Sequence, residues 1–422
     1  MRILSIAMYA AALSAAAALP LNARAQATPD TSPITLSQVF EQAWQRHPAF
    51  QSLPDRKAAS DASRQAAQAW TAQAPSLDVR TQDDRIGSDR GAREWEAGVV
   101  LPLWLPGQRA RAQQLAEGEA MAVEAHTAQA RLALAGQVRE AWWAWHRANA
   151  ELTLAEARVG HAQALLTDVQ RRVQAGDLAR SDQHQADGLL ASAVASQAQA
   201  QAQRSQAWQM LAAWIPGQGL RETTSAAPAQ IEATAPTVSE QALDIEAHPL
   251  VTVLAVQAKV ARQSAELAAT QVRANPELTL GTVQGRDQRG EGYQRALTLG
   301  LKLPLGSSPT QAAQAAKARA DASEIEAQLA LVRIQVEQSV TGARTRLMLA
   351  RTLQEATHKR ARLAKENQAF FGKSFRLGET DLPTRLRIDL EAQEAERQDA
   401  LARIEVFAAT SALRQAEGLL PQ

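Results

Sequence analysis

The charged residues that could act on a solute gather at two glycine-containing turns. The first turn contains Gly176 with Asp177 and Asp182, and the second contains Gly378 with Glu379, Asp381 and Arg387. Carboxylates crowded around one opening attract cations and raise the local cation concentration. An arginine one helical turn inside could bridge to a neighbouring carboxylate and hold the opening shut, and an exposed bridge of this kind is weak enough to be opened. In the simpler interpretation these acids only cap helices or face solvent, and the sequence leaves both interpretations open.

Motifs of enzymatic chemistry do not accompany these residues. The chain has no cysteine, which excludes disulfides, cysteine-ligated zinc and thiol catalysis. Its seven histidines include no pair with metal-site spacing, and no Gly-x-Ser-x-Gly elbow occurs. Gly372-Lys373-Ser374 ends like a phosphate loop, but Asn367 stands where the first glycine belongs. We therefore expect no catalytic residue, no cofactor and no resident metal. A paired-carboxylate enzyme on a helical scaffold is the alternative from a different class.

Composition favours long helices over a thick globular core. The 45 Lys+Arg residues are balanced by 44 Asp+Glu residues, and both signs are interspersed. We expect no nucleic-acid partner, because such proteins carry a basic face. Aromatic residues make up only 4% of the chain, whereas alanine and glutamine are abundant. This composition is typical of long helices.

Residues 1–25 have the pattern of a secretory signal peptide. Arg2 precedes an apolar, alanine-rich run, and Ala23-Arg24-Ala25 fits a small-x-small cleavage site. No later segment has the roughly 18 consecutive apolar residues of a spanning helix. The mature chain is therefore predicted to be exported, and to enter any membrane without helices.

The rest of the chain consists of two repeats of one structural unit. The matching landmarks lie 201 or 202 residues apart: His47-Pro48 and His248-Pro249, Pro75 and Pro276, Leu101-Pro102-Leu103 and Leu303-Pro304-Leu305, Gly176-Asp177 and Gly378-Glu379. The repeated histidines are interpreted as structural. We predict a first repeat at 26–215, a linker at 216–240 rich in proline, glycine, threonine and alanine, and a second repeat at 241–422.

Each repeat has the pattern of a helix, a β-hairpin, a very long helix, a turn and a returning helix. Alternating apolar residues predict strands at Leu77–Ile86, Glu94–Leu103, Glu277–Arg286 and Tyr293–Leu303. One helix is predicted from Leu36 to Gln73. From Gln108 to Ala175 apolar residues recur at gaps of 4 and 3, which predicts a coiled-coil helix on the order of 100 Å long.

Strands of about ten residues match a bilayer crossed by tilted strands. Four strands cannot close a barrel, and open sheet edges are not tolerated in lipid. We therefore predict a fold that is mainly α with a small β part: long coiled-coil helices plus four membrane strands per chain, which complete a 12-stranded β-barrel as a homotrimer. The side chains that share the apolar parity are predicted to face lipid, namely Trp95, Val99, Leu101, Leu297, Leu299 and Leu301.

The doubled unit, the His-Pro after the first helix, the Leu-Pro-Leu strand end and the Ala-Gly-Asp-Leu turn resemble TolC-type outer-membrane efflux channels. Within this family the segment Leu103-Trp104-Leu105-Pro106-Gly107-Gln108-Arg109 is most similar to CzcC-type components of heavy-metal efflux systems. Thr384 and Arg387 depart from the family, which often has an aspartate pair after the second turn. The chain also lacks the N-terminal cysteine that carries a lipid in some metal-type relatives.

The resemblance implies an outer-membrane channel of a tripartite efflux system, which conducts substrate passively from the periplasm to the exterior. Its implied partners are a periplasmic adaptor, an inner-membrane pump of the RND type and outer-membrane lipid. The two turns would form the periplasmic mouth, the gate and the adaptor-docking surface. Divalent heavy-metal cations are the implied cargo, with organic solutes or drugs as the alternative. A periplasmic coiled-coil adaptor is the alternative of another class, although adaptors normally have one helical hairpin and several β-domains.

Overall fold

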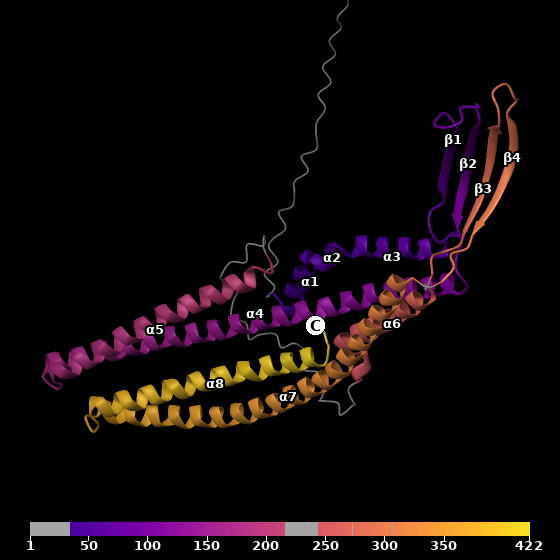
Figure 1. The fold of residues 1–422 in the computed structure, drawn as a ribbon. Coiled ribbons are helices and arrows are strands. Elements are labelled where there is room, and N and C mark those ends of the chain that lie inside the picture. Colours follow the sequence, from indigo (N-terminus) through magenta and orange to yellow (C-terminus); the bar gives the residue numbers. More distant parts are fainter. Residues whose placement is uncertain (1–33, 216–243, 272, 307) are drawn as a thin grey trace, which may run out of the picture. The chain divides into compact units, whose positions relative to one another are not determined.

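The computed structural model of the chain describes residues 34–215, 244–271, 273–306 and 308–422 (Figure 1). The predicted signal peptide, and all of the predicted linker at 216–240, lie outside these residues. In the first repeat the elements are α1 (Leu36–Arg46), α2 (Pro48–Gln51), α3 (Leu53–Gln68), β1 (Ser76–Asp83), β2 (Arg93–Pro102), α4 (Gln108–Ala175) and α5 (Arg180–Ala212). In the second they are the short 3-10 helix η1 (Ile245–Ala247), α6 (Pro249–Thr270), β3 (Glu277–Arg286), β4 (Gln294–Lys302), α7 (Pro309–Arg376) and α8 (Leu382–Ala416).

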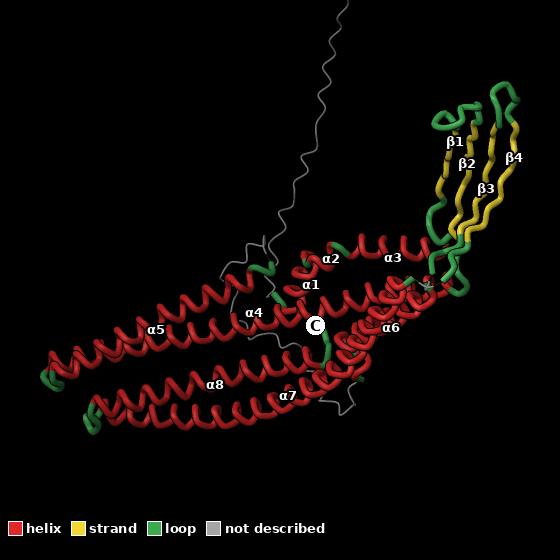
Figure 2. Tube along the Cα trace, viewed as in Figure 1, coloured by secondary structure: helices red, strands yellow, loops and turns green. Residues whose placement is uncertain are grey.

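Helices dominate the described residues, and the strands form one small sheet (Figure 2). This confirms the predicted fold class of long helices with a small β part. Within the described parts of the chain, no helix combines the length and the apolar character needed to cross a membrane.

The helical pattern from Leu36 to Gln73 forms three helices, so the single helix predicted there is wrong. Pro48 lacks an N–H and favours an extended residue before it, and His47 is extended with φ −67° and ψ 136°. The His47 Nδ1 atom then accepts a hydrogen bond from the Ala49 N–H at 3.2 Å and caps α2. His248 caps α6 in the same way, accepting from the Leu250 N–H at 3.2 Å. Both histidines therefore have the structural role that their repeated positions suggest.

The two long helices have the same length, 68 residues each. At about 1.5 Å per residue each spans on the order of 100 Å. α4 packs along α5 and α7 packs along α8, so that each repeat contains one long helical hairpin (Figure 1). α4 also contacts α8, which joins the two hairpins along their length.

All four strands pair antiparallel in chain order, β1-β2-β3-β4. The ladder between β2 and β3 joins the first repeat to the second. β1 ends at Asp83 rather than at the predicted Ile86, because the next residue folds the loop around its own side chain, as described below. β1 and β4 are the edges of the sheet, and no described strand pairs with their outer sides.

The largest apolar cluster lies where α1, α5 and α8 meet the middle of α4. Trp142, Trp143 and Trp145 of α4 are buried there, and Trp208 of α5 and Phe407 of α8 pack against them. These three tryptophans of the long helix therefore pack within one chain. This cluster holds the C-terminal end of α5 and the middle of α4 against α1 and α8.

Candidate functional site

One face of the sheet is apolar across all four strands. Directly opposite residues of an antiparallel pair point to the same face, so the pairing defines rows across the sheet. Three rows are mainly apolar, namely Leu101–Leu278–Leu301, Leu77–Val99–Leu280–Leu299 and Val79–Ala97–Thr282–Leu297. A fourth row nearer the loops, Thr81–Trp95–Gln284–Arg295, is polar except for Trp95. The six residues predicted to face lipid all lie in these rows. Leu297 and Leu299 are 92% and 74% exposed in the single chain, and with their neighbours in these rows they form a contiguous exposed apolar patch.

The opposite face of the sheet is polar and has small residues at its centre. Asp78, Gly98, Gly281 and Thr298 form one row there. A Cβ atom on Gly281 would lie 2.9 Å from the carbonyl oxygen of Ala97, which leaves no room for a side chain. The charged residues of this face pair in part with each other, Arg80 with Asp78 at 2.7 Å and Lys302 with Glu277 at 3.1 Å.

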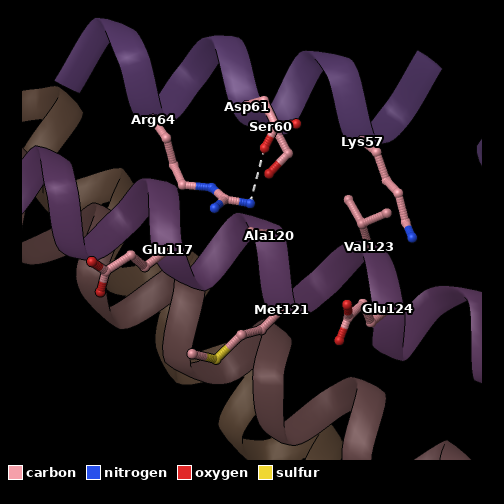
Figure 3. Close-up of a pocket in the computed structure, with 9 residues that line it drawn as sticks. All are labelled: Lys57, Ser60, Asp61, Arg64, Glu117, Ala120, Met121, Val123 and Glu124. Carbon is pink, nitrogen blue, oxygen red and sulfur yellow. Dashed lines mark ion pairs between the residues drawn. The ribbon is translucent and has the colours of Figure 1, made fainter. Parts of the chain in front are cut away.

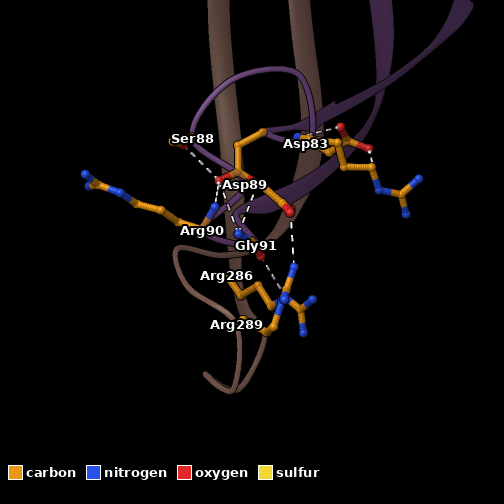
Figure 4. Close-up of polar contacts among 9 residues, drawn as sticks. Asp83, Ser88, Asp89, Arg90, Gly91, Arg286 and Arg289 are labelled. Carbon is orange, nitrogen blue, oxygen red and sulfur yellow. Dashed lines mark hydrogen bonds and ion pairs between the residues drawn. The ribbon is translucent and has the colours of Figure 1, made fainter.

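The loops beyond β1 and β3 are tied to each other (Figure 4). Asp84 folds the first loop, because its carboxylate accepts hydrogen bonds from the Ser88 hydroxyl and from the N–H groups of Arg90 and Gly91. The second loop is then held by an ion pair between Arg289 and Asp89 at 3.3 Å. The Arg289 N–H also donates to the Arg90 carbonyl at 2.9 Å. The two hairpin loops of one chain are therefore joined by an ion pair and a backbone hydrogen bond.

The segment from Leu103 to Arg109 forms a collar between the sheet and the long helix. The Trp104 indole N–H donates to the Ala69 carbonyl at 3.0 Å, and Arg109 donates to the Gln68 carbonyl, so both side chains cap the C-terminal end of α3. The Gln108 Oε1 atom accepts from the Leu105 N–H at 2.9 Å and from the Asn275 amide at 2.7 Å. The polar contacts of this motif are therefore structural, and they join α3, β2 and α4 to the residues before β3.

The first predicted turn reverses the chain between α4 and α5. Gly176 has φ 87°, a left-handed conformation that favours glycine. The Asp177 N–H donates to the Arg172 carbonyl at 2.8 Å and closes the end of α4. The Asp182 carboxylate accepts from the Ala179 N–H at 3.0 Å, at the start of α5. Asp177 is exposed.

The second predicted turn is built in the same way. Gly378 has φ 78°, and the Glu379 N–H donates to the Ser374 carbonyl at 3.0 Å. The Asp381 carboxylate caps α8 by accepting from the Thr384 N–H at 3.3 Å. Hydrogen bonding to Thr384 lowers the pKa of Asp381 below its usual value.

The acids at both turns therefore act as caps or lie at exposed positions within one chain. Arg387 is exposed, and within the described residues no carboxylate lies close enough to form an ion pair with it. A bridge from Arg387 would have to reach a carboxylate of another chain.

Sequence analysis missed the residue that joins the two turns. Arg172, in the last turn of α4, donates to the Phe375 carbonyl at 3.0 Å, and its guanidinium lies 4.7 Å from the centre of the Phe375 ring. Phe375 is in the last turn of α7, where the helix dipole favours a cation. Its carbonyl also accepts from the Gly378 N–H at 3.2 Å. Asp168 orients Arg172 through an ion pair at 3.3 Å. An apolar cluster beside this contact joins the two helical hairpins. It contains Leu166, Val169, Ala186, Phe375 and Leu382.

A polar groove lies between α3 and α4 (Figure 3). Its volume is ≈ 450 Å³, and Asp61 and Arg64 on its wall form an ion pair with each other at 3.1 Å. Among the described residues no group of three or more histidine or acidic side chains could hold a metal ion.

Comparisons with known proteins agree with this geometry. Residues 39–215 match the model of the family described as outer membrane efflux protein. No curated protein sequence matches the chain. The solved structure of the outer membrane protein VceC from Vibrio cholerae is similar, with a TM-score of 0.72 at 18% identity, over 92% of this chain and 97% of that chain.

Two other solved structures resemble the chain over nearly its whole length. A membrane protein from Pseudomonas aeruginosa has a TM-score of 0.73 at 18% identity, over 91% of this chain and 90% of that chain. CusC, solved in a study of transmembrane channel formation, has a TM-score of 0.73 at 13% identity, over 91% of this chain and 92% of that chain. The shared fold and the family match together confirm the predicted resemblance to TolC-type outer-membrane efflux channels.

Proposed function

We propose that this chain is one subunit of a trimeric outer-membrane efflux channel, which lets solute pass passively from the periplasm to the exterior. The observation that carries this proposal is the three-row apolar face of a sheet whose two edges are both unpaired among the described strands. Leucines exposed in rows are stable in lipid, whereas unpaired backbone groups in lipid cost several kcal/mol each. Three copies supply twelve strands and remove every edge.

The proposal places the chain in the outer membrane with a long periplasmic extension, after export by the signal peptide at 1–25. The two repeats, 26–215 and 241–422, each contribute one membrane hairpin and one helical hairpin, joined by the linker at 216–240. β2 leads into the first turn of α4, and Gly176 lies at the other end of this 68-residue helix. The helical hairpins therefore carry the solute path on the order of 100 Å away from the membrane.

The turns at Gly176–Asp182 and Gly378–Asp381 form the periplasmic mouth in this assignment. They would also be the gate and the docking surface for a periplasmic adaptor, through which an inner-membrane pump of the RND type supplies the energy. Three chains bring six turns around one axis, so that the acids of the turns attract cations. Within each chain the contact of Arg172 with Phe375 holds the two turns together, and this supports a mouth that is closed at rest.

Divalent heavy-metal cations are the proposed cargo, and the CzcC-like segment supports this only through resemblance. Its polar contacts hold the collar and give no direct recognition of a metal. A deletion strain tests the assignment: reduced tolerance to zinc, cobalt or cadmium is expected. Unchanged metal tolerance together with reduced tolerance to dyes or detergents would assign organic solutes instead. No enzymatic activity is proposed.

The channel itself is tested by solution mass and conductance. Purified protein in mild detergent should scatter light as a trimer and should form ion-conducting pores in planar bilayers. A monodisperse monomer with intact β-structure would overturn the proposal, as would a protein that stays soluble and folded without detergent. In the pores, Arg387→Ala or Asp182→Asn should raise conductance or change cation preference. If both variants conduct like the parent, the constriction lies elsewhere.

A further inference from the structure

The loop end of the apolar face carries arginines in place of leucines. The last row on this face joins Asp83, Arg93 and Arg286, and Arg295 lies in the row before it. Arg93 and Arg286 are directly opposite each other in the ladder between β2 and β3. Like charges at directly opposite positions destabilise a strand pair. An anion bound beside the two guanidinium groups would remove this cost.

Carboxylates of the chain do not neutralise these arginines. Asp83 forms its ion pair with Arg85 at 3.7 Å, although it lies in the row of Arg93. Glu94 points to the opposite face, because successive residues of a strand alternate between faces. Within the described residues, neither Arg93 nor Arg295 forms an ion pair or a side-chain hydrogen bond. The positive charge of this cluster is therefore open to an anion from outside the chain.

Arg286 is held in place by the first loop and by an aromatic ring. Its Nε–H donates to the Gly91 carbonyl at 3.1 Å (Figure 4), and its guanidinium lies 5.2 Å from the centre of the Tyr293 ring. The N–H groups on its two terminal nitrogens have no partner in the described parts of the chain. Trp95 is exposed in the row of Arg295. Aromatic rings of this kind gather where a barrel meets the headgroups of a membrane.

The depth of the cluster matches one boundary of a bilayer. β2 begins at Arg93 and runs for 10 residues to Pro102, next to the collar. At about 3.3 Å per residue and a tilt of about 40°, this strand crosses roughly 25 Å, which is the height of the apolar band of a barrel. The long helices begin at the Pro102 end. Arg93 therefore lies at the level of the headgroups on the side away from the helices.

We propose that Arg93, Arg286 and Arg295 bind the phosphate group of a lipid in the outer leaflet of the membrane. The inference rests on the proposed function, which places this face of the sheet in lipid. Guanidinium groups bind phosphate oxygens through paired N–H donors. Trp95 and Tyr293 lie where the headgroup meets the acyl chains, and the leucine rows below accommodate those chains. A free phosphate ion would use the same donors but would gain nothing from the leucine rows, so the surface fits a lipid better.

Two lipids that differ only in the phosphate group test the site. The trimer, purified in mild detergent, is mixed with equal amounts of phosphatidic acid and diacylglycerol that have the same acyl chains, and native mass spectrometry measures which lipid stays bound. The parent should retain phosphatidic acid in excess. Retention should fall roughly tenfold in Arg93→Gln/Arg295→Gln, because two of the three positive charges are lost. Arg286 is left in place because it holds the loop. Equal retention by parent and variant would overturn the proposal.

The matched control is Arg351→Gln/Arg362→Gln, which removes the same charge from exposed positions of α7. It should retain phosphatidic acid like the parent. Inorganic phosphate alone should raise the temperature at which the trimer dissociates much less than phosphatidic acid does, and an equal rise would overturn the assignment to a lipid. A conducting trimer that retains both lipids equally would overturn the site and leave the channel standing. A parent protein that is monomeric in detergent would overturn the proposed function itself.

Discussion

Acid should weaken the packing around His146, and replacing this residue should remove part of the effect. The imidazole of His146 lies on α4 with its ring centre 4.8, 5.6 and 4.7 Å from those of Trp142, Trp143 and Trp145. Its Nε2 atom is buried without a hydrogen-bond partner among the described residues. Burial lowers the pKa of His146 from 6.5 to about 4.

The sign of the effect follows from this lowered pKa. The unfolded chain binds a proton at His146 below pH 6.5, whereas the folded chain binds it only near pH 4. Stability is therefore complete above pH 6.5 and falls as the pH decreases toward 4. At about 1.4 kcal/mol per pH unit, the loss of unfolding free energy reaches about 2 kcal/mol per chain at pH 5.

The assay is unfolding by denaturant, followed by circular dichroism at 222 nm in mild detergent at pH 7.5 and 5.0. His146→Gln stays uncharged at both values, so its loss of stability between them should be about 2 kcal/mol smaller than that of the parent chain. His184→Gln, at an exposed position of α5, is the matched control and should behave like the parent. Equal losses in the parent and in His146→Gln would refute the reasoning.

Three further outcomes follow from the sheet and the turns. Leu299→Lys should reduce assembly in the membrane at a cost of roughly 2–4 kcal/mol, whereas Thr298→Lys on the opposite face should be tolerated; the reverse result in heat-resistant trimer yield would reverse the faces. Gly281→Ala should lower the trimer yield, because its Cβ would lie 2.9 Å from a backbone oxygen, whereas Gly300→Ala should be nearly neutral, since its nearest neighbour is at 3.6 Å. Arg172→Ala should raise single-channel conductance in planar bilayers, and an unchanged conductance would show that its contact with Phe375 does not restrain the mouth.

The strands were predictable because two signals coincide in them. Apolar residues at every second position define one face, and Leu-Pro-Leu marks where each hairpin ends at the collar. The ends of the strands in the loops were less predictable. β1 ends at Asp83 because Asp84 binds three groups of its own loop, and no sequence pattern distinguishes this aspartate from its neighbours Asp83 and Asp89.

The first helical region shows what periodicity alone misses. The apolar spacing continues through His47-Pro48 as if the helix were unbroken. However, α1 ends just before these residues, and the His47 side chain caps the start of α2. The landmark that revealed the repeat was thus also the signal for the helix break. A proline preceded by a residue whose side chain can accept a backbone hydrogen bond indicates the end of one helix and the start of the next.

The acids of the two turns were predictable from the sequence, whereas the contact that holds the two turns together was not. Glycines and capping acids leave a local signature, whereas Arg172 binds a backbone carbonyl 203 residues away, and every residue type carries such a carbonyl. The two kinds of contact also respond differently to salt. Added salt screens the attraction of exposed carboxylates for cations, but it acts weakly on a partly buried arginine that contacts a carbonyl and an aromatic ring. On the proposed assignment, salt should therefore reduce cation preference at the mouth before it changes how firmly the two turns are held together.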